Sequence, residues 1–234
     1  VGIDFAVADG CRDHGETSDA PCLAAISIAS ASVGESAVIL LARDLDSELL
    51  KQAMQNLMGN KEIVKVVHDV HRPALAWHSR CGVLFEEIDP VKFIDLQLLH
   101  EHCEDADQRS ISVLKLAMKC NSGLGDAVSD LSRTNHTFKA KLSSESKLQS
   151  CRRDALTAEH LQQAIYNAEI LAGMYSKLRS LPDASGAAPS AGEWAASVQV
   201  VTEMTVRRWE YAISNNGIPA IWFDPNSDYQ PRSL

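Results

Sequence analysis

Long hydrophobic runs, paired cysteines and an excess of positive charge are all missing from this chain of 234 residues. Because no run of about 18 apolar residues occurs, we expect no membrane insertion. The six cysteines form no CxxC pair, which predicts reduced thiols of an intracellular compartment: cytoplasm, nucleus or mitochondrion. A formal net charge of -9 argues against a protein coated in basic surface, although it leaves room for a local basic groove.

A signal peptide and an internal repeat are missing as well. The chain opens inside an apparent strand, so we expect it to be a piece of a longer protein, in which a targeting segment could precede it. What the chain does have is a hydrophobic content of 45%, enough to bury a substantial core. One domain of α/β type is therefore the expected architecture.

Short apolar segments predict three strands in an antiparallel meander, at residues 1–8, 22–28 and 36–42, with a polar loop at 10–19. A further strand is predicted at 63–68. Apolar positions at helical spacing predict helices at residues 46–57, 73–80, 95–103, 112–120, 157–178 and 194–214. Asp46 or Ser47 is the expected N-cap of the first helix. Strands first and helices mixed afterwards predict a mixed sheet covered on both faces.

Proline, glycine, alanine and serine dominate residues 181–193, which predicts a flexible linker. It would join an α/β domain, residues 1–180, to a C-terminal helix and irregular tail, residues 194–234. We expect this extension to pack on the domain or on a partner. Three of its aromatic side chains could bury against another protein or cap their own domain: Trp209, Trp222 and Phe223.

Several segments in the same order resemble the RNase D-like 3′–5′ exonucleases of the DEDD superfamily. Residues 65–68 match a strand ending in histidine, Cys81-Gly82-Val83 a turn, and Ile94-Asp95-Leu96-Gln97 a strand ending in Asp-Thr-Gln. Residues 153–161 (RDALTAEHL) resemble the Arg-Pro-Leu-Thr-x-x-Gln-Leu run before the family's last helix. The resemblance covers residues 1–178 and implies a ribonuclease H-like mixed sheet flanked by helices, with a C-terminal helical extension.

The family cleaves the terminal phosphodiester with two divalent ions held by four carboxylates. The resemblance implies that this chain has kept one of them, in a vestigial site composed of Asp4, Ala6, Pro73, Gln163 and Asn167. Asp4 is the retained carboxylate, whereas the other four positions have lost the glutamate, the helix aspartate, the tyrosine and the last aspartate. One carboxylate cannot offset about four positive charges in a cleft, so we expect no catalytic residue, no metal and no cofactor. Gln163 and Asn167 can still hydrogen-bond a nucleotide.

Two alternatives would restore a metal ion. A register shift could bring Asp69 or Glu169 into the site, but relatives often have an aspartate at position 69 that binds no metal. Glu169 lies roughly 200° around the helix from Asn167. A transition metal could instead use His68 with His71, or the set His100, His102 and Cys103. For these side chains we favour an ordinary place at strand and helix ends.

Charge is distributed unevenly along the chain. Six basic residues against Glu145 give residues 133–153 an excess of +5, which makes them a candidate nucleic-acid-binding segment: Arg133, Lys139, Lys141, Lys147, Arg152 and Arg153. Residues 86–107 hold eight acids against Lys92 alone. That acidic stretch should repel nucleic acid, and it is either a solvated surface or a contact for a basic protein.

Three functions remain open. The first is a catalytically inactive domain, similar to the degenerate exonuclease-like domains of the Egalitarian type, that serves as an RNA-binding or protein-docking module in a ribonucleoprotein. Its partners would be single-stranded or structured RNA and the proteins of a larger complex. The second is a purely structural subunit of a large assembly. The third is a divergent, active 3′–5′ exoribonuclease that uses Mg²⁺ or Mn²⁺ with non-standard ligands.

Overall fold

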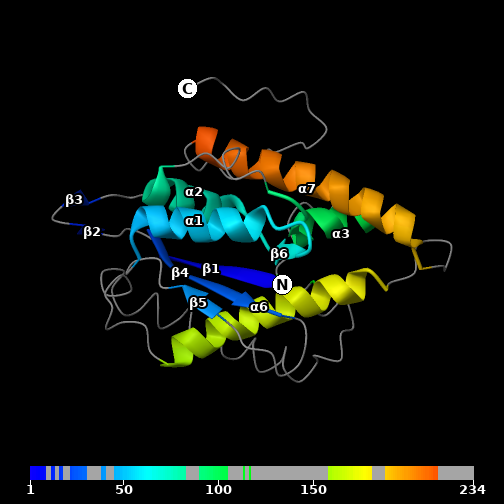
Figure 1. Cartoon of the computed structure of the whole chain (residues 1–234), viewed down its shortest axis with the longest axis horizontal. Coiled ribbons are helices and arrows are strands. Elements are labelled where there is room, and N and C mark those ends of the chain that lie inside the picture. Colours follow the sequence, from blue (N-terminus) through cyan, green and yellow to red (C-terminus); the bar gives the residue numbers. More distant parts are fainter. Residues whose placement is uncertain are drawn as a thin grey trace.

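The computed structural model of the chain describes residues 1–8, 12–13, 16–17, 22–30, 38–40, 45–82, 90–104, 113, 116, 158–180 and 188–215. Within these residues the protein is an α/β domain in which helices cover both faces of a mixed sheet (Figure 1). The predicted α/β class and the helices on both faces are confirmed. Among the helices that the structure describes, none combines the length and apolar character needed to cross a membrane.

The main sheet has five strands in the order β5-β4-β1-β6-β7, with β1 (Gly2–Ala8) at its centre. On one side β4 (Cys22–Ala29) and β5 (Val38–Leu40) run antiparallel and complete the predicted meander. On the other side β6 (Lys65–Val67) and β7 (Phe93–Asp95) run parallel to β1. Parallel neighbours require a crossover connection, and helices α1 and α2 lie on these crossovers.

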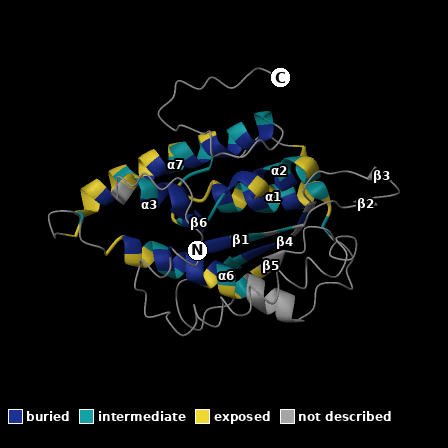
Figure 2. Cartoon of the chain, turned by 180° about the vertical axis from the view of Figure 1, so that it is seen from behind, coloured by how far each residue is buried: buried dark blue, intermediate teal, exposed yellow. Residues whose placement is uncertain are grey.

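The helices form a layer on each face of this sheet. On one face lie α1 (Ser47–Met58), α2 (His71–Cys81) and α7 (Ala191–Ser214), and on the other lies α6 (Ala158–Leu178) (Figure 1). Helix α3 (Leu96–Glu104) follows β7 directly and packs against α7. The buried sides of these helices turn toward the sheet and toward one another (Figure 2).

Two clusters of buried side chains form the core. The first lies between the sheet and the layer of α1, α2 and α7, and includes Ile3, Ile26, Met54, Trp77 and Trp209. The second joins the β6–β7 edge to α3, α6 and α7, and includes Val66, Ile94, Leu99, Met174 and Val201. Helix α7 contributes to both clusters, so it belongs to the domain's own core.

Helix α1 begins and ends as its sequence predicts. The Asp46 carboxylate accepts a hydrogen bond from the Glu48 N–H at 2.8 Å, which makes Asp46 the N-cap, and Gly59 is the C-cap. Leu50, together with two methionines one and two turns later, is buried. Leu49 is 58% exposed, because it lies one position outside that buried stripe.

Some element boundaries differ from the predictions. Residues 10–19 were predicted as a loop, but β2 (Arg12–Asp13) and β3 (Glu16–Thr17) pair there in a two-stranded ladder, which satisfies backbone groups that a plain loop leaves to solvent. Strand β7 ends at Asp95, so the second half of the predicted strand 94–97 is wrong. The reason is that Asp95 accepts a hydrogen bond from the Gln97 N–H at 2.9 Å and thereby starts α3.

Helix α7 begins at Ala191, within the segment predicted to be a linker. The Ser190 hydroxyl accepts from the Glu193 N–H at 3.3 Å, and the Glu193 carboxylate accepts from the Ser190 N–H at 2.8 Å. This reciprocal capping box satisfies two backbone donors at once and sets the start of the helix. The apolar register predicted for residues 194–214 is confirmed, since most of its members are buried: Val198, Val201, Thr205, Arg208 and Ala212.

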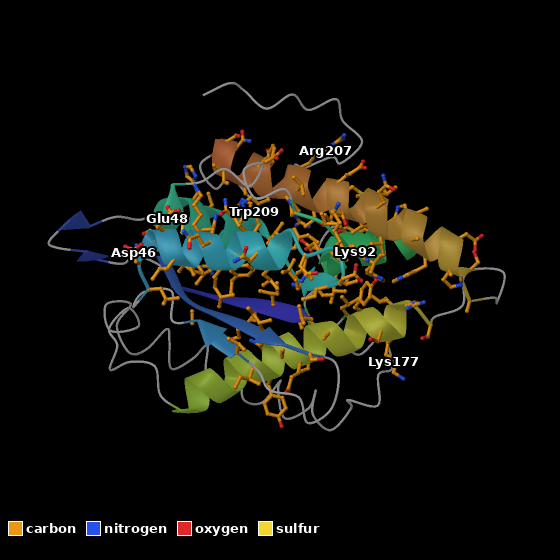
Figure 3. The ribbon with its side chains drawn as sticks, in the orientation of Figure 1. Asp46, Glu48, Lys92, Lys177, Arg207 and Trp209 are labelled. Atoms are coloured by element: carbon orange, nitrogen blue, oxygen red, sulfur yellow. The ribbon has the colours of Figure 1, made fainter. Side chains whose placement is uncertain are left out.

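Trp209 is fully buried inside the domain, where Figure 3 shows it under α7. Its ring contacts Phe5 and Phe93 edge-on, with centroids 6.0 Å apart in each case. Of the two roles expected for Trp209, the structure shows burial in its own domain and not docking on a partner, because the side chain completes the core. Trp222 and Phe223 lie outside the described residues, as do most of 112–120 and the whole basic segment 133–153.

Candidate functional site

The candidate site lies where the central strand continues past its parallel neighbour. Strand β6 pairs with β1 at Gly2 and ends at Val67, whereas β1 continues to Ala8. Asp4 therefore lies level with His68, the first residue after β6. Polar groups gather at such a position because the carboxyl ends of parallel strands leave side chains without a neighbouring strand to cover them.

A hydrogen bond joins the side chains of Asp4 on β1 and Asn167 on α6. The Asn167 side-chain N–H donates to the Asp4 carboxylate, with Nδ2 and Oδ2 3.1 Å apart, and so links β1 to α6 over 163 positions. Both side chains are partly buried. Thus two of the five residues of the predicted vestigial site lie in direct contact.

Gly2 explains how α6 comes so close to β1. A Cβ at this position would lie 1.7 Å from the backbone oxygen of Ala168, a separation that no side chain can adopt. The helix therefore rests on the bare backbone of the strand, one residue away from Asn167. Close packing of two rigid elements fixes the Asp4–Asn167 geometry.

Burial dominates the electrostatics of Asp4 and raises its pKa to about 6. The hydrogen bond from Asn167 and the nearby charge of His68 act in the opposite direction and limit the rise in pKa. Asp4 is therefore mostly ionised at neutral pH and gains a proton under mildly acidic conditions. The site can present either a carboxylate or a carboxylic acid to a ligand.

Ser27 adds an unexpected polar group to the site. It pairs directly with Asp4 across the β1–β4 ladder, which places both side chains on the same face of the sheet. Ser27 is fully buried, and its hydroxyl has no hydrogen-bond partner among the described residues. A buried hydroxyl of this kind needs a water or a ligand atom. The signal was visible in the sequence as the one polar residue in the apolar run of β4, CLAAISIA.

For the other three residues of the predicted vestigial site, the structure gives only a position in the fold. Pro73 is buried in the first turn of α2, which lies on the opposite face of the sheet from α6 (Figure 1). Ala6 lies on β1 two positions beyond Asp4. Gln163 lies on α6 one turn before Asn167. The side chains of Ala6 and Gln163 lie outside the described parts of the chain.

The two substitute carboxylates are directed elsewhere. Glu169 is exposed on α6, which fits the prediction that it turns away from Asn167. Asp69 adopts φ 54°, accepts from the His71 N–H at 3.3 Å and lies 3.8 Å from an Arg208 nitrogen. In the described part of the chain, no three His, Cys, Asp or Glu side chains are grouped so that they could hold a metal ion.

A second polar centre surrounds Asp95, which is fully buried at the end of β7. Its carboxylate accepts from the N–H groups of Asp69 and Val70 at 3.2 Å and from that of Gln97 at 2.9 Å. Arg208 supplies the balancing charge, with Nη1 3.6 Å from Oδ2 of Asp95. This residue of the family-like strand motif therefore has a structural role, because it ties β7 to the starts of α2 and α3 and to α7.

Comparison with known proteins gives no external guide to the site. No protein-family model matches the chain, and no curated protein matches it. The function has to be argued from the chemistry of Asp4, Asn167 and their neighbours.

Proposed function

We propose that this chain is a catalytically inactive 3′–5′ exonuclease-like domain of ribonuclease H-like fold that binds RNA within a ribonucleoprotein. The observation that carries the proposal is the hydrogen bond between Asp4 and Asn167. The resemblance expects two metal-binding carboxylates at these positions. A carboxylate and an amide occupy them, and they satisfy each other directly.

This pair is a poor ligand set for two hard cations. Mg²⁺ prefers oxygen ligands whose charge balances its own, and a two-ion site also needs oxygens that bridge the ions. Here the Asn167 N–H points at Asp4 and occupies one of its oxygens. Because the amide brings no charge, we propose that phosphodiester cleavage has been lost.

The arrangement of the chain supports the ribonuclease H-like part of the proposal. An antiparallel meander comes first, and two parallel strands follow through helical crossovers. Helix α6 then returns to the central strand and brings position 167 to position 4, as the resemblance implies. The pairing of two residues so far apart in sequence supports that alignment.

RNA is the partner that the polar chemistry favours. The partly exposed carboxylate of Asp4 and amide of Asn167 can accept from and donate to ribose hydroxyls. The chain leading into α6 also carries the excess of +5 in residues 133–153, despite a net charge of -9 overall. A basic segment that precedes the helix of Asn167 in the sequence suits a backbone of phosphates.

The test combines RNA degradation and RNA binding on one preparation of the whole chain. A 5′-labelled single-stranded RNA is incubated with the protein and Mg²⁺ or Mn²⁺, and we expect no shortening. In EDTA we expect binding that weakens steeply with salt. Replacing Lys139, Lys141, Arg152 and Arg153 by serine should reduce the slope of log affinity against log salt by up to about 3.

A matched control removes the same charge from exposed basic residues elsewhere: Lys61, Lys92, Lys177 and Arg207, of which the last three are labelled in Figure 3. This control should retain most of the affinity. Metal-dependent shortening that Asp4→Ala abolishes would establish an active exonuclease instead. Absence of RNA binding at low salt, with a protein partner that co-purifies, would identify a structural subunit.

A further inference from the structure

Tyr166 has a different environment from every other described aromatic side chain. It is 43% exposed, whereas the remaining aromatic rings of the described residues are buried or partly buried. It directly precedes Asn167 on α6, about 100° around the helix. An exposed ring therefore lies next to the polar pair of the candidate site.

The position of Tyr166 explains its exposure. One, two and three turns further along α6, Ile170, Met174 and Leu178 are buried in the second core cluster, against β6 and β7. Helix α6 runs opposite to β1, because position 2 meets Ala168 while position 4 meets Asn167. Moving back to Tyr166 thus leads past Val67 and Asp95, where β6 and β7 end in the described part of the chain.

Polar groups follow Tyr166 directly on the helix. Val38, Leu49 and Val200 are also exposed, but they belong to β5, α1 and α7. Tyr166 instead directly precedes Asn167, whose side-chain N–H donates to the Asp4 carboxylate. A single flat ring beside hydrogen-bonding groups matches one nucleotide better than it matches the broad apolar surface of a protein partner.

We propose that Tyr166 is a stacking platform for one base of a bound single-stranded RNA, while the sugar of that nucleotide lies against Asp4 and Asn167. This inference rests on the proposed function, since it requires that the domain binds RNA. It adds Tyr166 as an RNA-binding residue and a preference among bases. Stacking accepts any base but favours purines, which offer the larger π-surface.

The experiment measures the affinity of the whole chain in EDTA for fluorescein-labelled oligoadenylate and oligouridylate of equal length. We expect the wild type to bind oligoadenylate several-fold more tightly. Tyr166→Leu should weaken oligoadenylate binding about 5- to 100-fold and oligouridylate binding less, so the preference disappears. Tyr166→Phe should retain affinity, because the ring is kept. Ser176→Leu places the same leucine at another exposed position of α6 and should change nothing.

Two further readouts separate stacking from folding and from charge. Tyr166→Trp should bind oligoadenylate at least as tightly as the wild type, because indole is the larger stacking surface. The salt slope should stay the same in Tyr166→Leu, since no phosphate contact is lost. If Tyr166→Leu and wild type bind both RNAs equally, the stacking inference is overturned and the proposed function stands. If the wild type binds neither RNA, both fail.

Discussion

Asn167 donates a hydrogen bond to Asp4 across 3.1 Å, and a neutral amide suits both protonation states of its partner. It donates its N–H to a carboxylate, and after rotation its oxygen accepts from a carboxylic acid. Two facing carboxylates lack this freedom unless a cation lies between them. The raised pKa of Asp4 therefore makes the pair sensitive to acid.

Replacing Asp4 by asparagine should stabilise the domain at neutral pH. Burial raises the pKa of Asp4 from its ordinary 3.8 to about 6, so the folded state binds the proton more tightly than the unfolded state. The contribution of Asp4 to stability is greatest below pH 3.8 and is lost as the pH rises through about 6. At pH 7.5 we expect Asp4→Asn to unfold with a free energy higher by about 1–2 kcal/mol, since partial exposure weakens the full effect.

Urea denaturation of the wild type and Asp4→Asn between pH 4 and pH 8 tests this expectation. The two curves should converge toward the acidic end and separate as the pH rises. Glu169→Gln, an exposed carboxylate two positions from Asn167 on α6, serves as the control and should follow the wild type throughout. A less stable Asp4→Asn variant at pH 7.5 would contradict the assignment of burial as the dominant effect.

Replacing Asn167 by aspartate should recreate a cation site. Two carboxylates would then lie about 3 Å apart, and their repulsion should lower the free energy of unfolding at pH 7.5 by about 1–3 kcal/mol. Millimolar Mn²⁺ should restore the lost stability, measured as a rise in melting temperature. Asn56→Asp, on the exposed side of α1, is the matched control and should not respond to Mn²⁺. Equal Mn²⁺ responses in the two variants would exclude the site.

Substituting Gly2 by alanine should be severely destabilising. The new Cβ would meet backbone atoms of Ala168, which cannot rotate away, so β1 and α6 have to separate. We expect a loss of about 3 kcal/mol in the free energy of unfolding. Gly192→Ala is the control: a Cβ there meets nothing within 4 Å, and the helical position should gain about 0.5–1 kcal/mol. Similar stabilities for the two variants would disprove the close approach.

Removing the charge of Arg208 should destabilise the second polar centre. Arg208→Met leaves the buried Asp95 carboxylate without its cation, and we expect a loss of about 3 kcal/mol in chemical denaturation. Arg207→Met is the neighbouring control on the outer side of α7 (Figure 3), and should change stability by less than about 0.5 kcal/mol. Equal effects would show that the ion pair does not hold β7 to α7.

Local patterns in the sequence predicted the features that depend on local interactions. The cap of α1 at Asp46, the meander around β1 and the buried stripe of α7 all follow from neighbours within a few residues. The start of α2 at His71 could not be predicted in this way. Its N-cap residue, Val70, has no capping side chain, and the backbone donors there are satisfied by Asp69 and by Asp95, 25 residues further along the chain.

The candidate site likewise contains residues that the sequence identified and residues whose role depends on distant contacts. Asp4 and Asn167 were identified because each lies in a recognisable segment, and the structure joins them. Ser27 was missed, since its importance depends on which residue faces it across the sheet. The pairing of Arg208 with Asp95 was missed for the same reason: the sequence places arginine in an apolar stripe but does not show the acid that lies beside it. The RNA-binding role of residues 133–153 stays a prediction.

The membership of α7 in both core clusters has a consequence for how the protein is made. Until a ribosome has translated α7, neither cluster has the side chains of that helix, and the positions later covered by Val201 and Trp209 face water. Stable folding of this domain must then await the emergence of α7, and until that point the nascent chain stays open to chaperones and to aggregation.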